Sequence, residues 1–314
     1  MKLLMTSKEQ IRLSNAVAPS FREMHRDIKC GGHTHYWLPG GRGSTKSSFV
    51  GIEIPLGIMR DEKAGEITNA VVLRRYGVTL RDSVFAQILW GLHVLGVSNL
   101  WRATVSPLAL TYKKSGQQIL FRGADDPMKV KSIKVPIGYI KYAWYEEVNE
   151  FEGEEKIRSL NQSLMRGGRN FAFFYTFNPP PSSRNWCNQY VSVSHPGTMV
   201  VHSTYLTVPR EWLGEPFIVE AEHLKETKPT AYAHEYLGEV TGTGGEVFDN
   251  VNFVELPDEV IDRFDRIRRG IDWGYATDPF VYNECHYDKT RRRLYIFREL
   301  HQVRLKNRKA AELI

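Results

Sequence analysis

The stretch from His33 to Ser48 decides the fold of this chain. It reads His-Thr-His-Tyr-Trp-Leu-Pro-Gly-Gly-Arg-Gly-Ser-Thr-Lys-Ser-Ser. An aromatic run that alternates like a strand reaches Pro39, and a glycine-rich turn follows it. Lys46 and two hydroxyl residues then open a segment that is compatible with a helix. Backbone N–H groups of such a turn, and of the first turn of the helix, can all point at one anion. The stretch therefore predicts a phosphate-binding loop.

The loop matches the pattern G-x-x-x-x-G-K-[ST] with one exception. Gly40, Lys46 and Ser47 are in register, whereas Thr45 replaces the second glycine and would strain the loop if that position needs a positive φ. We expect Lys46 to reach the β- and γ-phosphates of a nucleotide and the Ser47 hydroxyl to hold Mg²⁺. The alternative is a plain glycine-rich turn between a strand and a helix. The predicted nucleotide contacts are Gly40, Gly41, Arg42, Gly43, Ser44, Thr45, Lys46, Ser47 and Ser48.

The composition sets wide limits. With 314 residues, of which 42% are hydrophobic, the chain can form one large or two ordinary domains. The 42 Lys+Arg against 36 Asp+Glu give a net charge of +6, which suits a polyanionic partner but equally describes a mildly basic surface. The three cysteines are far apart, and no apolar run approaches the ~18 residues of a membrane helix. We expect a soluble cytoplasmic protein with no membrane partner.

Strands and helices are expected to alternate after the loop. The expected elements are a helix over 48–59 that Pro55 limits or kinks, a buried strand over 69–75, a helix over 80–95, a hairpin over 113–121 and strands over 138–147 and 170–180. This alternation favours an α/β fold with a mostly parallel sheet.

The strand over 138–147 ends in two carboxylates, Glu146 and Glu147. In a phosphate-loop ATPase, the first acid at such a strand end supports Mg²⁺ and the second polarises the attacking water. The alternative is a solvated acidic helix start, because further glutamates follow as far as Glu155 and the helix dipole favours them there. The phosphate loop upstream favours the catalytic interpretation.

The strand over 170–180 ends in Thr176 and Asn178, before three prolines stop it. Small polar groups at the carboxyl end of a central strand lie where ligands bind in open α/β sheets. Asn178 is therefore a candidate sensor of the γ-phosphate. A side chain that merely caps the turn before proline is an equally good interpretation.

The remainder of the chain is turn-rich, and the glycine-rich run from Thr241 predicts a hinge. Beyond it, the sequence predicts a β-hairpin whose first strand carries Asp272, with Glu299 after the second strand. Such acids can bind a metal for phosphodiester cleavage, although two carboxylates are common by chance. The predicted division is a nucleotide-binding domain over 1–240, a linker over 241–264 and a further domain over 265–314.

Taken in order, the motifs resemble the large subunit of a tailed-bacteriophage terminase, of the PBSX-type branch. The residues that carry the resemblance are Gly-Gly-Arg-Gly-Ser-Thr-Lys-Ser-Ser at 40–48, Val-Leu-Arg-Arg at 72–75, Leu-Arg-Asp-Ser at 80–83, Trp-Tyr-Glu-Glu at 144–147, Thr-Phe-Asn-Pro-Pro at 176–180, His-Ser-Thr-Tyr-Leu at 202–206, His-Glu-Tyr-Leu-Gly at 234–238 and Gly-Ile-Asp-Trp-Gly at 270–274. The similarity extends over nearly the whole chain from about Gly32.

The resemblance implies a phosphate-loop ATPase domain of the additional-strand class, followed by the beginning of a ribonuclease-H-like nuclease domain. It assigns Glu146 to the Walker B metal role and Glu147 to the catalytic base. Thr176 and Asn178 match the motif that couples hydrolysis to movement, and Arg42 matches a loop arginine that touches the γ-phosphate. Two departures are Thr45, at the usual glycine, and Glu146, at the more general aspartate.

The resemblance also implies a function and partners. The expected protein is an ATP-driven motor that moves double-stranded DNA into a viral procapsid in the host cytoplasm. Its implied partners are a small terminase subunit, the portal protein and further copies of itself in a ring. Asp272 matches the first metal-binding aspartate of the nuclease, but later carboxylates should lie beyond residue 314. Only about 50 residues follow Asp265, too few for a domain core, so this chain is expected to be truncated and unable to cut DNA.

Two alternative functions remain open at the level of sequence. One is a metal-dependent DNA endonuclease that acts through Asp272. The other is a DNA-binding assembly protein with a degenerate nucleotide site that does not hydrolyse ATP. The first requires metal-dependent nicking, and the second requires salt-sensitive DNA binding without turnover.

Overall fold

A computed structural model describes residues 13–125, 133–242, 254–274 and 279–314 of this chain. The chain divides into two compact units, Met1–Glu246 and Val247–Ile314. The division falls within the range 241–264 that the sequence predicts as a linker, and residues 243–253 of that range lie outside the described residues.

The first unit is built on an eight-stranded sheet in the order β3-β4-β5-β2-β6-β7-β1-β8. Its strands are β1 (His35–Pro39), β2 (Thr68–Arg74), β3 (Trp101–Val105), β4 (Leu108–Tyr112), β5 (Gln118–Gly123), β6 (Tyr139–Glu146), β7 (Ala172–Phe177) and β8 (Thr198–Val200). Neighbouring strands are parallel along β5-β2-β6-β7-β1-β8. At the other end of the sheet, β4 is antiparallel to β5 and β3 is antiparallel to β4. The predicted α/β fold with a mostly parallel sheet is confirmed.

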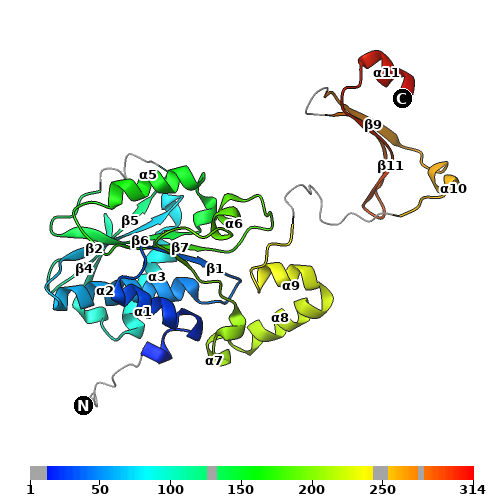
Figure 1. Cartoon of the computed structure of the whole chain (residues 1–314). Helices are drawn as coiled ribbons and strands as arrows, with labels where there is room; N and C mark the ends of the chain where they lie inside the picture. The colour runs from blue at the N-terminus through cyan, green and yellow to red at the C-terminus, as the bar shows by residue number, and fades with distance from the viewer. Residues whose placement is uncertain (1–12, 126–132, 243–253, 275–278) are drawn as a thin grey trace. The chain divides into compact units, whose positions relative to one another are not determined.

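Helices cover both faces of the sheet (Figure 1). The helices of this unit are α1 (Arg22–Cys30), α2 (Lys46–Lys63), α3 (Ala86–Val94), α5 (Glu154–Leu164), α6 (Trp186–Val191), α7 (Arg210–Leu213), α8 (Glu215–Thr227) and α9 (Pro229–Glu235). The first three lie on one face, and α5 and α6 lie on the other. Successive residues of a strand point to opposite faces, so Trp144 joins the core under α2 whereas Tyr145 joins the core under α5.

Helix α2 corrects one expectation, because it continues for 18 residues with Pro55 inside it. A proline in a helix removes one backbone hydrogen bond and is expected to limit it. Here the neighbouring Ile52, Ile54 and Ile58 are fully buried, and burial on this scale outweighs the lost bond.

Two further expectations about strands are corrected. The hairpin predicted over 113–121 uses β4, which ends at Tyr112, so Lys113 lies in the turn and not in a strand. In the second unit, Asp272 does not lie on the first strand of the hairpin but ends a strand of its own, β9 (Ile267–Asp272). Glu299 lies within the second hairpin strand and not after it. The prediction missed that β10 pairs with β9 as well as with β11, because local sequence does not specify such pairing.

The second unit contains a three-stranded antiparallel sheet in the order β11-β10-β9. The two remaining strands are β10 (Phe280–Asp288) and β11 (Arg293–Gln302), and the helices are α10 (Asp258–Ile261) and α11 (Asn307–Leu313). Phe280, Tyr282, Leu305 and Ala310 form its small core. Its identity as the start of a ribonuclease-H-like domain stays a prediction.

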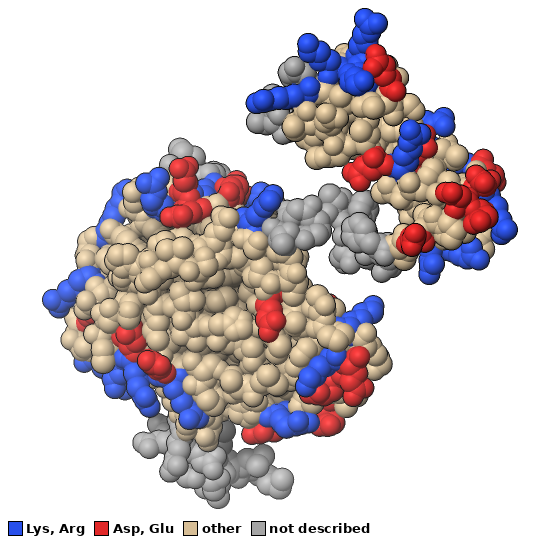
Figure 2. Space-filling model, turned by 45° about the vertical axis from the view of Figure 1, so that its right-hand side comes forward, with Lys and Arg blue, Asp and Glu red and all other residues tan. Residues whose placement is uncertain are grey.

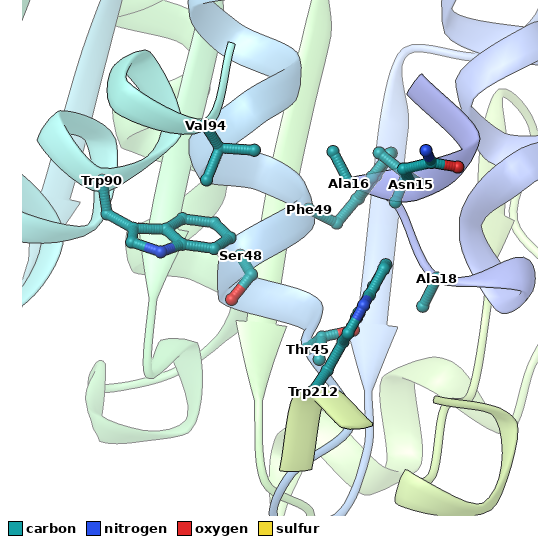
Figure 3. A pocket seen from close by; sticks show the side chains of 10 residues that line it. Asn15, Ala16, Ala18, Thr45, Ser48, Phe49, Trp90, Val94 and Trp212 are labelled. Carbon is teal, nitrogen blue, oxygen red and sulfur yellow. The ribbon is translucent and has the colours of Figure 1, made fainter. Parts of the chain in front are cut away.

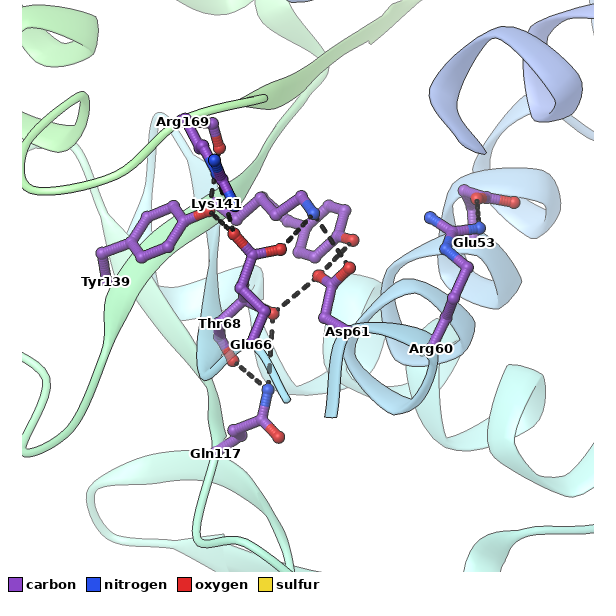
Figure 4. A network of polar contacts seen from close by, with 10 residues as sticks. Glu53, Arg60, Asp61, Glu66, Thr68, Gln117, Tyr139, Lys141 and Arg169 are labelled. Carbon is purple, nitrogen blue, oxygen red and sulfur yellow. Dashed lines mark hydrogen bonds and ion pairs between the residues drawn. The ribbon is translucent and has the colours of Figure 1, made fainter. Parts of the chain in front are cut away.

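A buried polar network fastens the last turns of α2 to the amino ends of β2 and β6 (Figure 4). The Asp61 carboxylate accepts hydrogen bonds from the Thr68 hydroxyl at 2.8 Å and from the Tyr142 hydroxyl at 2.7 Å. It also pairs with the Lys141 ammonium at 2.9 Å, which lies 3.2 Å from Glu66 as well. Since every charge in this network has an opposite partner, it holds α2 in place against the sheet.

Charges of both signs are interspersed around the first unit, and in the view of Figure 2 they surround a broad uncharged area. The net charge of +6 is therefore not gathered into one basic face in that view. Among the described residues, no helix has both the length and the apolar character needed to cross a bilayer.

Candidate nucleotide-binding site

Three neighbouring parallel strands bring the predicted site residues to one edge of the sheet. In the order β6-β7-β1, Glu146 pairs in register with Thr176, and Phe177 pairs with Pro39. The phosphate loop leaves β1 at this edge, and the loops after β6 and β7 begin beside it. Parallel strands end together, so residues far apart in sequence meet where ligands bind in open α/β sheets.

The loop backbone has the left-handed turns that a phosphate loop requires. Gly43 has φ +71°, and a side chain there would also meet Phe217 of α8 at 2.4 Å. Gly41 approaches the Tyr236 carbonyl so closely that a Cβ would lie 2.0 Å from it. Thr45 has φ 62°, so the strain expected for a β-branched residue at this position is present.

Some of the loop N–H groups are used inside the protein and others are not. The Gly41 N–H donates to the Ser203 carbonyl at 3.2 Å, and the Arg42 N–H donates to the Glu235 carbonyl at 2.8 Å. No acceptor among the described residues serves the N–H groups of residues 43–45. These groups stand just before the positive end of α2, so together they can bind an anion.

Two hydroxyl groups in the loop are also without partners in the described part of the chain. Ser44 is buried, and neither its Oγ nor the Thr45 Oγ1 makes a hydrogen bond. Buried polar groups are normally paired in a folded protein. Their lack of partners points to a ligand that supplies hydrogen-bonding atoms at this loop.

Lys46 begins α2 and is 8% exposed. Its ammonium donates to the carbonyl oxygens of Gly40 at 3.2 Å and Gly41 at 3.4 Å, and to Asn178 Oδ1 at 2.5 Å. Burial lowers the pKa of Lys46 to about 8, although the negative charges of Glu147 and Glu146 oppose the shift. A cation held by neutral oxygens at a helix N-terminus is suited to receive a phosphate.

Glu146 ends β6, and its Oε2 lies 3.2 Å from the Nε of Arg74 at the end of β2. The contact is an ion pair without the alignment of a hydrogen bond. Burial raises the pKa of Glu146 to about 7, partly offset by Arg74 and increased again by Glu147. Sequence reasoning did not pair Arg74 with Glu146, because that contact depends on β2 lying next to β6.

Glu147 follows the strand with φ 50° and ψ 53°, which turns the chain sharply after Glu146. Burial raises its pKa, and the charges of Lys46 and Arg74 lower it. A half-buried carboxylate with a raised pKa near a cation is suited to general-base catalysis. A short 3-10 helix, Val148–Glu150, begins right after Glu147, and α5 begins at Glu154. The alternative of a solvated acidic helix start disagrees with the burial that raises the pKa of both carboxylates.

The structure separates the two residues predicted for coupling. Asn178 contacts Lys46 directly, so it belongs to the site. Thr176 is 1% exposed and accepts a hydrogen bond from the Trp144 indole at 2.8 Å, inside the core under α2. Its side chain therefore joins β7 to β6 on the face of the sheet that α2 covers, and no described hydrogen bond links it to Lys46.

Arg42 also lies differently from the other loop residues. Its side chain is 64% exposed, and its Nε is 3.7 Å from a carboxylate oxygen of Glu235 at the end of α9. In this arrangement α9 holds the Arg42 side chain, which makes no contact with Lys46 among the described interactions.

A cavity of about 320 Å³ lies beside the start of α2, and sequence reasoning did not find it (Figure 3). Trp90 of α3 and Trp212 of α7 form part of its wall, together with Thr45, Ser48 and Phe49. Val94 and the segment Asn15–Ala18 complete the lining. The cavity has the volume and the aromatic character of a pocket for a flat ring such as a nucleobase. Only the aromatic residues themselves signal it in the sequence.

Asp272 lies in the second unit, on an exposed strand. Across the described residues, no group of three or more His, Cys, Asp or Glu side chains is arranged to hold a metal ion. Of the carboxylates near it in sequence, Glu284 is engaged by Arg269 at 2.8 Å and by the Tyr282 hydroxyl. Among the described residues, Asp272 is therefore a candidate ligand that is not part of a complete metal site.

A phosphate-loop site next to a strand-end acid pair is common to many ATPases, and comparison with known proteins distinguishes among them. The family model of the phage terminase large subunit matches residues 32–239. The large terminase subunit of Bacillus phage SPP1 is 40% identical over 308 residues, which cover 95% of this chain and 71% of that protein. The chain belongs to the phage terminase large subunit family. Its role as a viral DNA-packaging ATPase, predicted from the motifs, goes with this family.

Two further comparisons concern a second relative and the fold. The PBSX phage terminase large subunit of Bacillus subtilis (strain 168) is 25% identical over 303 residues, which cover 89% of this chain and 67% of that protein. The large terminase of a thermophilic bacteriophage has the same fold, with a TM-score of 0.56 at 13% identity over 94% of this chain and 72% of that one.

Proposed function

We propose that this chain binds the triphosphate of ATP in the loop over residues 40–48 and the base in the cavity between Trp90 and Trp212. The observation that carries the proposal is Lys46, a buried cation at the start of a helix. Among the described residues, its hydrogen-bond partners are all neutral oxygens, and the N–H groups just before it are unpaired. The large terminase of the thermophilic bacteriophage, which shares the fold, has been solved with ADP and with ATP-γ-S.

The donor set at the loop suits Mg²⁺. The Ser47 hydroxyl and the Glu146 carboxylate are oxygen ligands, which Mg²⁺ prefers, and Glu146 Oε2 has no hydrogen bond to a described residue. Ser47 and Glu146 would hold the ion, which would neutralise charge on the β- and γ-phosphates when bound. Arg74 holds Glu146 in position from the neighbouring strand.

Glu147 is the proposed base of the reaction. Its partly buried carboxylate accepts a proton from the attacking water and aims that water at the γ-phosphate. The nearby cation of Lys46 stabilises both the ionised carboxylate and the charge that develops on the phosphate.

Asn178 is the proposed sensor of the γ-phosphate. Its side-chain oxygen accepts a hydrogen bond from the Lys46 ammonium. A triphosphate competes for the same ammonium, so binding and hydrolysis change the partner of Asn178 at the end of β7. Thr176 contributes by fixing β7 to β6 through Trp144. Arg42 can serve the γ-phosphate only after it leaves Glu235.

The proposed cargo and partners follow from the family. They are double-stranded DNA, a small terminase subunit, a portal protein and other copies of the chain in a ring. Asp272, at the end of β9, is proposed as the first metal ligand of a nuclease site.

Phosphate release from Mg²⁺-ATP, with and without double-stranded DNA, tests the site. Lys46→Ala should weaken nucleotide binding and abolish turnover, because the phosphates lose their buried cation. Glu147→Gln should lower turnover by about 10³-fold while binding stays within about threefold, because it removes only the base. Glu152→Gln, at a glutamate whose side chain is 54% exposed, is the matched control. Turnover that survives Glu147→Gln would refute the assignment, and DNA binding without any turnover would favour the assembly-protein alternative.

A further inference from the structure

A second cavity, of about 440 Å³, lies at the end of α2 that is remote from the phosphate loop. We call it the basic cavity, because His25, Lys29, Arg60 and Lys63 stand in its lining. Helix α2 extends about 27 Å at 1.5 Å per residue, so a ligand in the basic cavity does not obstruct the nucleotide site.

The two lysines of the basic cavity have unpaired charges. Lys29 lies in the last turn of α1, and Lys63 is the last residue of α2. Both are exposed, and neither has an ion pair or side-chain hydrogen bond with a described residue. The helix dipoles favour cations at both places but leave the full charges available.

A buried carboxylate fixes the two other basic side chains. Glu53 is 0% exposed, and its Oε2 lies 2.6 Å from the Nδ1 of His25. Its Oε1 is 3.7 Å from the Arg60 guanidinium, a pair that Figure 4 shows. Glu53 therefore offsets the charge of Arg60 and holds both side chains in a defined geometry, so the excess positive charge of the lining comes from Lys29 and Lys63.

The interior of the basic cavity is apolar. Met59 is 9% exposed and Tyr112 is 5% exposed, and both line it together with Leu56 and Val97. Leu100, which is 39% exposed, stands at the same cavity. A DNA backbone would satisfy the lysines but would leave this hollow unfilled, because it offers no apolar group to insert. A ligand with both carboxylates and an apolar side chain satisfies both parts.

We propose that the basic cavity docks an acidic amphipathic segment of a partner protein. Its carboxylates pair with Lys29 and Lys63, and one of its apolar side chains enters the hollow beside Leu100 and Met59. Charge complementarity sets the orientation of the segment, and burial of the apolar anchor supplies affinity. This docking needs no nucleotide and is independent of the function proposed for the phosphate loop.

The test is fluorescence anisotropy with the full chain and a labelled synthetic peptide of about 15 residues, with Glu on one helical face and Leu on the other. The double variant Lys29→Glu, Lys63→Glu should weaken binding at least about tenfold. Lys228→Glu with Lys289→Glu, at two exposed lysines outside the cavity, makes the same change in net charge and should stay within about twofold. Leu100→Asp should weaken binding without touching a lysine, and thermal unfolding checks that each variant is folded.

Several outcomes would overturn the proposal. The peptide could fail to bind the wild-type chain, or both charge variants could weaken it equally, which would show a general charge effect. A poly-glutamate peptide that binds as tightly would exclude the apolar anchor. If a short DNA duplex binds the wild-type chain and the control charge variant equally well but binds the Lys29→Glu, Lys63→Glu variant more weakly, the surface would be assigned to DNA. A peptide with the acidic sequence of residues 254–265 that binds more tightly than the designed one would point to a second copy of this chain.

Discussion

Two buried lysines stand near opposite ends of α2 and differ in their partners. Lys141, near the last turn, pairs with Asp61 at 2.9 Å and with Glu66 at 3.2 Å. Lys46, the first residue of α2, is held by two carbonyl oxygens and the Asn178 side chain, and no carboxylate forms an ion pair with it among the described residues. The protein therefore balances the charge of Lys141 but not that of Lys46.

The difference separates a structural site from a binding site. Removing a charge from water is costly unless an opposite charge compensates it, and at Lys141 the compensation is built in. At Lys46 burial lowers the pKa to about 8, while Glu147 and Glu146 act on it only from a distance. A polyanion that binds here provides the missing compensation, so part of the cost of burial returns as binding affinity.

The largest expected effect comes from removing the partner of Lys141. Asp61→Ala should lower the free energy of unfolding by about 3–5 kcal/mol, because Lys141 then keeps a buried charge with only the half-buried Glu66 beside it. Urea unfolding measures the change. Lys46→Met, the matched variant at the other end, should not lower stability, since it removes an uncompensated cation.

A double variant sharpens the same point. Asp61→Ala with Lys141→Met removes both charges, so it should recover part of the stability lost by Asp61→Ala alone. If Lys46→Met proved as destabilising as Asp61→Ala, the two lysines would have the same role and the comparison would be wrong.

The second effect is a pH dependence of the free energy of unfolding that arises from Lys46. Its pKa is about 8 in the folded chain and near 10.5 when unfolded. Below pH 8 both states hold the proton, and between pH 8 and 10.5 the folded state releases it first, so stability rises with pH by up to about 3 kcal/mol. Guanidinium unfolding of wild type and Lys46→Met across this range gives the difference, and ATP affinity should fall over the same range. Parallel curves for the two proteins would contradict the assignment.

A third, smaller effect concerns Arg74. Arg74→Ala should lower ATP turnover about tenfold, because Glu146 loses the partner that positions it, and Arg74→Lys should restore part of the rate. The affinity for ATP without Mg²⁺ should change little, whereas the Mg²⁺ concentration needed for half-maximal turnover should rise. Arg169→Ala, at an 84% exposed side chain, is the control. An unchanged Mg²⁺ requirement would remove Arg74 from the site.

The smallest effect is at Thr45. Without nucleotide, Thr45→Gly should stabilise the chain by about 1 kcal/mol, since glycine adopts φ 62° without the strain of a β-branched residue. Thr45→Ala, which keeps a Cβ, should not give the same gain. Thermal unfolding compares the two variants, and a loss of stability in Thr45→Gly would mean that packing by the threonine side chain outweighs its backbone strain.

Local patterns were sufficient to predict the loop over 40–48, the acids at the end of β6 and Asn178 at the end of β7. Each of these depends on a strand followed by a turn, which the order of apolar and turn residues specifies. The contact of Arg74 with Glu146 and the cavity between Trp90 and Trp212 were not predictable in this way. Both arise from neighbours in space that are distant in sequence, and strand order is not written in any single segment.

The sequence by itself determined that this chain has a phosphate loop, a mostly parallel sheet and acids at a strand end, because these follow from short-range spacing. The tertiary structure decided which polar residues face the ligand. Strand order brought Asn178 to Lys46, and the adjacent strand β6 gave the Thr176 hydroxyl a partner in Trp144. The same packing left Lys46 without an opposite charge in contact and gave Lys141 two, because compensation of a buried charge depends on which segments meet in space.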